Sequence, residues 1–177
     1  HFDPPVERSE KAWVFGGNAN LPRDVAIRWI REVPDEFHAR FKALGRRYRY
    51  VILNQPSRPV LERANATWCR DPLNADAMHE AAQALVGEHD FSSFRGAGCQ
   101  SLTPMRRVDQ VLVRRQGAFV VMEIEANAFL LHMVRNIASG LLNVGLGAAD
   151  SYLADLLAAR DRTALGVTAP PQGLYLS

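Results

Sequence analysis

Cationic and aromatic side chains are concentrated between Glu36 and Asn54. This stretch contains no acid, and it sets Tyr48 and Tyr50 among cations. The cations are Arg40, Lys42, Arg46, Arg47 and Arg49. Arginine suits phosphate because its planar guanidinium donates two hydrogen bonds at once. We therefore predict that the cluster binds phosphate, although solvated surface charge is the simpler interpretation for any single arginine.

Composition sets limits on the class of protein. With 177 residues, the chain is expected to form one domain or two small lobes. Its 47% hydrophobic content is enough for a real core, which argues against wholesale disorder. The net charge of +2 is too small to indicate a polyanion partner by itself, so the distribution of charge is more informative. A second acid-free stretch, between Asp90 and Asp109, contains Arg95, Arg106 and Arg107.

The sequence gives no support to metal, nucleotide or serine-hydrolase chemistry. It contains no CxxC, P-loop, GxGxxG or GxSxG pattern, and its histidines lack metal-ligand spacing. Two distant cysteines, Cys69 and Cys99, are typical of reduced thiols in a cytoplasmic protein. The longest mostly apolar segment, 137–149, is well short of the roughly 20 residues that span a bilayer, so no membrane association is expected.

Hydrophobic periodicity and turn residues predict the helices and strands that carry the tyrosines and arginines. Helices are expected after the N-caps Ser9 and Asn74, the second ending at Gly87, and over 129–144 and 152–159. Strands are expected at 25–29, 41–54, 108–115, 118–126 and 173–177. The strands connect through hairpins and not through repeated βαβ units. The order therefore indicates an α+β fold with a mixed, mainly antiparallel sheet flanked by helices.

Six stretches, in register along the whole chain, resemble the bacterial tRNA pseudouridine synthase A family. They are NANLP, FHARFKALGRRYRY, DFSSFR, CQS, NAFLLHMVRN and GLYL. The resemblance implies a pseudouridine synthase-like fold. It also implies a cytoplasmic homodimer that isomerises uridines in the tRNA anticodon arm without a metal or cofactor.

The family's nucleophilic aspartate lies in a GRTDAGVH motif, which these 177 residues do not contain. The resemblance therefore implies that residues 1–177 are the C-terminal portion of a synthase, an RNA-binding and dimerisation lobe with half of the active-site cleft. We expect this portion to be inactive alone. The alternatives are a non-catalytic RNA-binding module and a dimerisation element.

The resemblance also assigns roles to individual residues. Tyr48 would lie in the cleft against the target uridine, because a base must leave its stack to be reached and an aromatic face can hold it. Arg135 would pair with the nucleophilic aspartate, and Leu176 would form the floor of the pocket. The RNA backbone would be bound by Arg40, Arg46, Arg47 and Arg49. Tyr50 is expected to pack in the core, and Leu131 stands where the family often has histidine.

Overall fold

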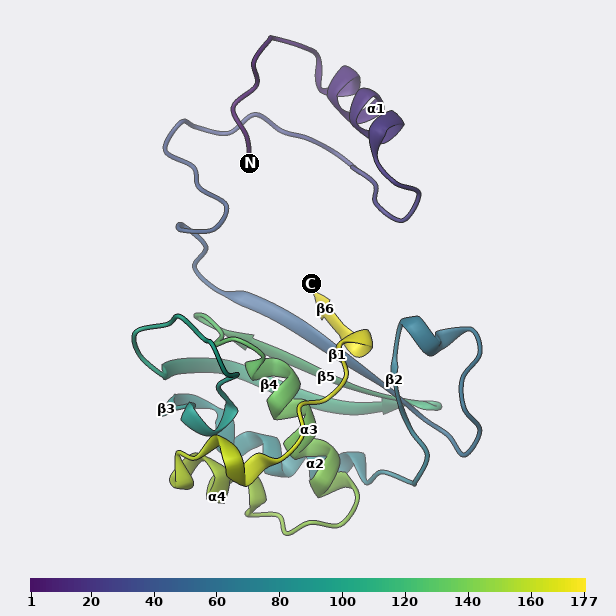
Figure 1. Ribbon diagram of the computed structural model, residues 1–177, viewed down its shortest axis with the longest axis vertical. Coiled ribbons are helices and arrows are strands. Elements are labelled where there is room, and N and C mark those ends of the chain that lie inside the picture. Colours follow the sequence, from purple (N-terminus) through teal and green to yellow (C-terminus); the bar gives the residue numbers. More distant parts are fainter. The chain divides into compact units, whose positions relative to one another are not determined.

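The computed structural model describes residues 1–177, which divide into an N-terminal unit, His1–Ala43, and a larger unit, Leu44–Ser177 (Figure 1). The N-terminal unit contains helix α1 (Glu10–Asn20). As predicted, Ser9 caps α1, its Oγ accepting a hydrogen bond from the N–H of Ala12 at 3.2 Å.

The strand predicted at residues 25–29 is wrong, because this segment pairs with no other strand. The main chain of Ile27 bonds instead to the side-chain amide of Asn18. Asn18 Nδ2 donates to the Ile27 carbonyl at 2.8 Å, and the Ile27 N–H donates to Asn18 Oδ1 at 2.6 Å. One side chain thus satisfies the groups that a neighbouring strand would otherwise have paired.

The larger unit contains one six-stranded sheet with the order β2-β1-β5-β4-β3, and β6 also pairs with β1. Its strands are β1 (Arg46–Asn54), β2 (Thr67–Cys69), β3 (Gly87–Asp90), β4 (Met105–Gln116), β5 (Phe119–Ala126) and β6 (Leu174–Leu176). Only β1 and β2 are parallel, so the predicted mixed, mainly antiparallel sheet is confirmed. The short strands β2 and β6 share one edge of β1, because β6 lies opposite residues 48–50 and β2 opposite 52–54.

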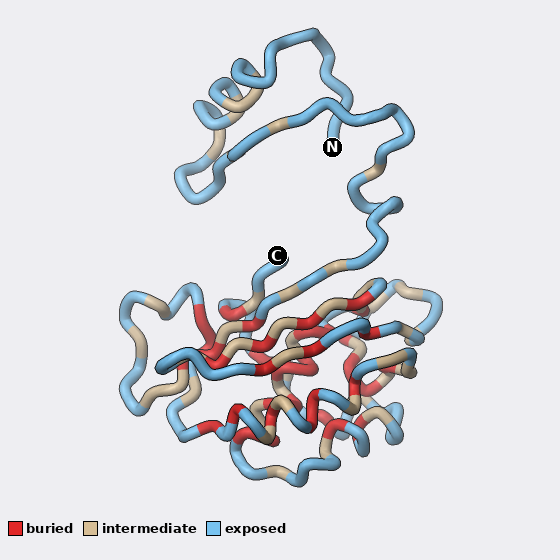
Figure 2. The backbone as a smooth tube through the Cα atoms, turned by 180° about the vertical axis from the view of Figure 1, so that it is seen from behind, coloured by how far each residue is buried: buried red, intermediate tan, exposed pale blue.

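Helices cover one face of this sheet and enclose the core (Figure 2). They are α2 (Ala75–Ala82), α3 (Met133–Gly145) and α4 (Tyr152–Ala159). Short 3₁₀ turns are η1 (Glu62–Ala64), η2 (Gln83–Leu85), η3 (Ser92–Phe94), η4 (Arg162–Leu165) and η5 (Pro171–Gly173). The predicted apolar stripe of α3, Met133, Ile137 and Leu141, is fully buried. None of the helices combines the length and apolar character that crossing a membrane requires.

Several element boundaries differ from the predictions. Strand β1 begins at Arg46 instead of residue 41, and β4 begins at Met105 instead of residue 108. Helix α3 begins at Met133 instead of residue 129, because His132 has a left-handed φ of 60° and cannot continue a helix. The predicted helix after Asn74 stops being α-helical at Ala82 and tightens into η2. The N-cap at Asn74 and the hairpin around Gly117 are confirmed, Gly117 supplying the positive φ of 60° that the turn requires.

Gly173 lets the C-terminal segment approach β1 closely, and replacing it tests that approach. A Cβ atom at this position would clash with the carbonyl oxygen of Val51 and lie 3.1 Å from Thr67 Oγ1. We expect Gly173→Ala to lower the free energy of unfolding by about 1–3 kcal/mol, as overpacking usually does. Chemical denaturation would measure the loss. Gly16→Ala is the matched control, since a Cβ there meets nothing within 4 Å, and an equal effect of both variants would contradict the close approach.

Candidate active site

Tyr48 lies on the helix-covered face of β1, and its ring is half-buried. Its register partners are Ile124 of β5 on one side and Leu176 of β6 on the other. The edge of its ring packs against Phe129, with ring centroids 5.1 Å apart and an interplanar angle of 89°. Leu176 is 70% exposed, whereas Tyr48 is partly buried.

Tyr50 follows on the same face, and its predicted place in the core is confirmed, because its side chain is fully buried. Its hydroxyl donates to the carbonyl oxygen of Pro170 at 2.7 Å and lies 2.6 Å from Thr67 Oγ1. Burial raises the pKa of Tyr50, while the Thr67 hydrogen bond and the charge of Arg135 act in the opposite direction. The buried phenol therefore stays protonated and serves as a hydrogen-bond donor.

Arg135 leaves the buried stripe of α3 and is half-buried. Its Nε donates to the carbonyl oxygen of Ala169 at 2.7 Å, and no acid of the chain forms an ion pair with it. Ala169 precedes Pro170, and the same segment runs on to Leu176. One short segment therefore connects the residues that sequence reasoning singled out: it bonds Arg135, bonds Tyr50, and places Leu176 opposite Tyr48.

Two arginines of the predicted phosphate cluster lie on the opposite face of the sheet from Tyr48. Strand alternation exposes Arg47 and Arg49 there, directly across from Glu125 and Glu123 of β5. Arg47 donates to Glu125 through Nη2 at 2.6 Å and Nε at 3.0 Å, and Arg49 Nε donates to Glu123 at 2.5 Å. These two arginines therefore do not lie beside Tyr48, and their contact with RNA stays a prediction.

A third arginine completes this arrangement, which we call the ion-pair ladder: Arg47, Arg49, Arg114, Glu123 and Glu125. Arg114 Nη2 donates to the second carboxylate oxygen of Glu123 at 2.6 Å. Partial burial raises the pKa of Glu123, but the hydrogen bonds and charges of Arg114 and Arg49 outweigh it and hold the pKa below its usual value. Any polyanion that binds this face must compete with the carboxylates.

The other predicted cations lie elsewhere. Arg46 is on the same face of β1 as Tyr48 and is half-buried, with Nη1 3.5 Å from the carbonyl oxygen of Asn127. Arg40 belongs to the N-terminal unit, where its guanidinium lies 5.7 Å from the centre of the Phe41 ring. The structure thus does not gather the four predicted RNA-binding arginines on one surface of the larger unit.

Arginines of the second acid-free stretch organise a loop. Arg95 Nη2 donates to the carbonyl oxygens of Cys99 and Ser101, and Arg106 Nη2 donates to Ser101 Oγ at 2.5 Å. Burial lowers the pKa of Arg106, whose Nε has no hydrogen-bond partner. No group of three or more His, Cys, Asp or Glu side chains is close enough together to hold a metal ion.

Sequence reasoning missed Thr67 and Pro170, the partners of the Tyr50 hydroxyl, and Phe129, the partner of the Tyr48 ring. Thr67 lies in a three-residue strand, too short to show a period. Phe129 lies in the irregular segment before α3 and not in the helix predicted over 129–144. Two features of the sequence could have indicated these contacts: the aromatic side chain of Phe129, and the Pro170-Pro171 pair, which is typical of a turn.

Comparison with known proteins identifies the class of enzyme domain to which this fold belongs. Residues 81–177 match the family model described as tRNA pseudouridine synthase. The chain belongs to the tRNA pseudouridine synthase family. The resemblance inferred from its motifs is thereby confirmed.

Individual relatives match over 99% of the chain. It is 55% identical to tRNA pseudouridine synthase A of Methylococcus capsulatus and covers 65% of that protein. It is 52% identical to the enzyme of that name from Enterobacter sp. and 51% identical to the one from Escherichia coli O1:K1, covering 66% of each. The chain thus spans about two thirds of the length of these relatives.

Proposed function

We propose that this chain is the part of a tRNA pseudouridine synthase that receives the target uridine, in the anticodon arm of tRNA. The observation that carries the proposal is the single segment that bonds Arg135 and places Leu176 opposite Tyr48. The identity to enzymes named tRNA pseudouridine synthase A supports tRNA as the substrate. We further propose a cytoplasmic homodimer that needs no metal or organic cofactor.

In the proposed reaction, the uridine leaves its stack and lies against Tyr48, with Leu176 beneath it. Pseudouridine forms when the glycosidic bond breaks and the base rejoins the sugar through carbon. A nucleophilic carboxylate must be ionised and oriented for this step, and a nearby guanidinium achieves both. Arg135 is the candidate for that cation, because it lies beside the segment that ends at Leu176.

We propose that the carboxylate comes from outside residues 1–177. Arg135 is paired with no acid, and none of the chain's aspartates stands in a GRTDAGVH motif. These residues would then form an RNA-binding and dimerisation lobe that contributes half of the cleft. The alternative, a module that binds RNA or dimerises without catalysis, applies to the chain by itself.

An isomerase assay tests the function and its division between segments. We expect a polypeptide of residues 1–177 to release no tritium from tRNA labelled at carbon 5 of uridine. A full-length protein that contains these residues should release it. Failure of the full-length protein would refute the proposed function, whereas turnover by residues 1–177 alone would place the nucleophile inside them.

Tyr48 variants of the full-length protein test the role of the aromatic ring. Tyr48→Phe keeps the stacking face and loses the hydroxyl, whereas Tyr48→Ala loses both. We expect only the alanine variant to bind tRNA more weakly, by about 1–3 kcal/mol, because that is the usual contribution of base–aromatic stacking. Titration by fluorescence anisotropy would measure the binding. Tyr175→Ala is the control, since Tyr175 lies opposite Arg49 on β6, and normal rates and affinity for both Tyr48 variants would contradict the role.

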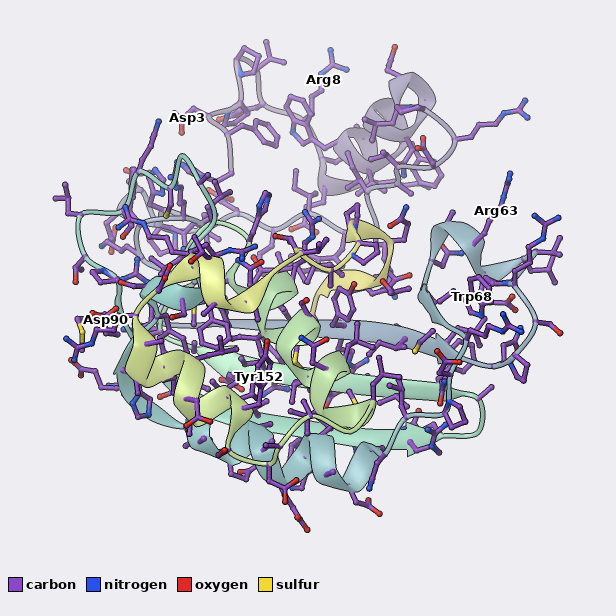
Figure 3. The ribbon with its side chains drawn as sticks, turned by 60° about the horizontal axis from the view of Figure 1, so that its bottom comes forward. Asp3, Arg8, Arg63, Trp68, Asp90 and Tyr152 are labelled. Atoms are coloured by element: carbon purple, nitrogen blue, oxygen red, sulfur yellow. The ribbon has the colours of Figure 1, made fainter.

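Salt dependence of tRNA binding tests the arginine cluster. Each lost phosphate contact reduces the log–log salt slope by about 0.7–0.9 unit. We expect the double variant Arg46→Gln and Arg47→Gln to reduce the slope by up to twice this amount, because it removes two cations. The control removes the same charge at Arg63 and Arg70, exposed residues outside the cluster (Arg63 in Figure 3). A slope unchanged by the first pair, or lowered equally by both pairs, would place the cluster outside the RNA path.

A further inference from the structure

The segment from Gly166 to Pro170, which we call the strap, is bonded at every residue by a different side chain. Four of the bonds go to strap carbonyl oxygens, and the fifth is donated by the Thr168 hydroxyl. The bonds are Arg162 Nη1 to Gly166 at 2.7 Å, Ser139 Oγ to Val167 at 2.6 Å, Thr168 Oγ1 to Asn136 Oδ1 at 2.8 Å, Arg135 Nε to Ala169 at 2.7 Å and Tyr50 Oη to Pro170 at 2.7 Å. A segment without helix or strand geometry is thereby fixed in one conformation.

The partners that hold the strap are themselves fixed. Asn136 is fully buried, donates to the carbonyl oxygen of Phe94 at 2.7 Å, and accepts from Thr168 and, at 3.3 Å, from Arg162. Because the single Tyr50 hydroxyl proton goes to Pro170, the neighbouring Thr67 hydroxyl must donate to Tyr50. The strap is therefore anchored to the core on both sides of Ala169.

Arg135 is oriented through this anchored segment. Its Nε–H is occupied by the Ala169 carbonyl, and the guanidinium is planar, so this bond restricts the direction in which both Nη groups point. Among buried side-chain nitrogen and oxygen atoms, only Arg106 Nε lacks a partner. The Nη groups of Arg135 form no hydrogen bond to a protein atom and are not fully buried, so they keep hydrogen-bonding capacity for a ligand.

We propose that the strap is a positioning device for Arg135 and that Tyr50 and Thr168 are its positioning residues. The strap would hold the guanidinium so that its two Nη groups present a fork to one carboxylate, the geometry of a bidentate pair. This inference rests on the proposed function for the identity of that carboxylate. The orientation of Arg135 by the strap is independent of it.

The first experiment measures that orientation in the 177-residue chain by NMR. The Arg135 Nε–H should exchange slowly with solvent, because it donates to a half-enclosed carbonyl. We expect Tyr50→Phe and Thr168→Val to speed its exchange by about tenfold or more, which corresponds to the loss of roughly 1.4 kcal/mol of protection. The controls Tyr152→Phe and Thr103→Val remove hydroxyls whose bonds lie away from the strap. Equal exchange rates in all four variants would overturn the proposal.

The second experiment uses the full-length protein and separates positioning from general stability. We expect Tyr50→Phe and Thr168→Val to lower kcat by about 10- to 100-fold, since small misplacement of a catalytic group has effects of this size. KM for tRNA should match that of the two controls. Because loss of the buried Tyr50 hydroxyl lowers stability, kcat is compared well below the thermal midpoint of every variant, where all of them are folded. An Arg135→Lys variant has neither the Nε–H that bonds to the strap nor the two Nη groups. In that background the strap variants should cause no further loss of kcat.

The outcomes distinguish the two proposals. Full additivity of the strap variants with Arg135→Lys, or a loss confined to KM, would overturn the positioning role while the proposed function stands. An unmodified full-length protein without isomerase activity would overturn the proposed function. In that case the NMR exchange data would still decide whether the strap orients Arg135.

Discussion

The hydroxyl of Tyr50 imposes the constraint on which this end of the molecule depends. Its ring lies in the core between β1 and the helices, and a buried hydroxyl without partners would cost about 1–3 kcal/mol. The partners come from two segments that are far apart in the sequence, Thr67 of β2 and Pro170 of the strap. Satisfying one polar group therefore brings both segments to the same edge of β1.

The path of the chain from Pro170 to Leu176 is determined by its attachment at this edge of β1. Once Pro170 is fixed, η5 turns the chain and Gly173 allows it to pass close to Val51. The chain then joins β1 as β6, in a register that puts Leu174 opposite Tyr50 and Leu176 opposite Tyr48. A strand of only three residues has little stability of its own, so the bonds of the strap and the close approach at Gly173 set its register.

The sequence specified the long elements and the types of the site residues, but not the contacts between them. The hairpin around Gly117 and the stripe of α3 were predictable because each rests on a period or turn signal within one window. Strand alternation could also have separated Arg47 and Arg49 from Tyr48, and the corresponding glutamates on β5 were visible as alternate residues. The pairing of β1 with β5, β2 and β6 could not be predicted, because these strands are far apart in the sequence and no local pattern specifies which of them pair. The short strands β2 and β3 and the turn at His132 carried no periodic signal, whereas the short strand β6 lies within the predicted strand at 173–177.

Arg135 bonds through Nε to a neutral carbonyl group and not to an acid, so its positive charge is retained. The Ala169 carbonyl is a neutral dipole, so it orients the guanidinium without cancelling its charge. A carboxylate bonded at Nε would have oriented it equally well and neutralised it. In the proposed active site, the retained positive charge would lower the pKa of an approaching carboxylate and keep it ionised. The strap and the charge of Arg135 therefore have separate roles. The strap sets the direction of the guanidinium, and the charge attracts the carboxylate.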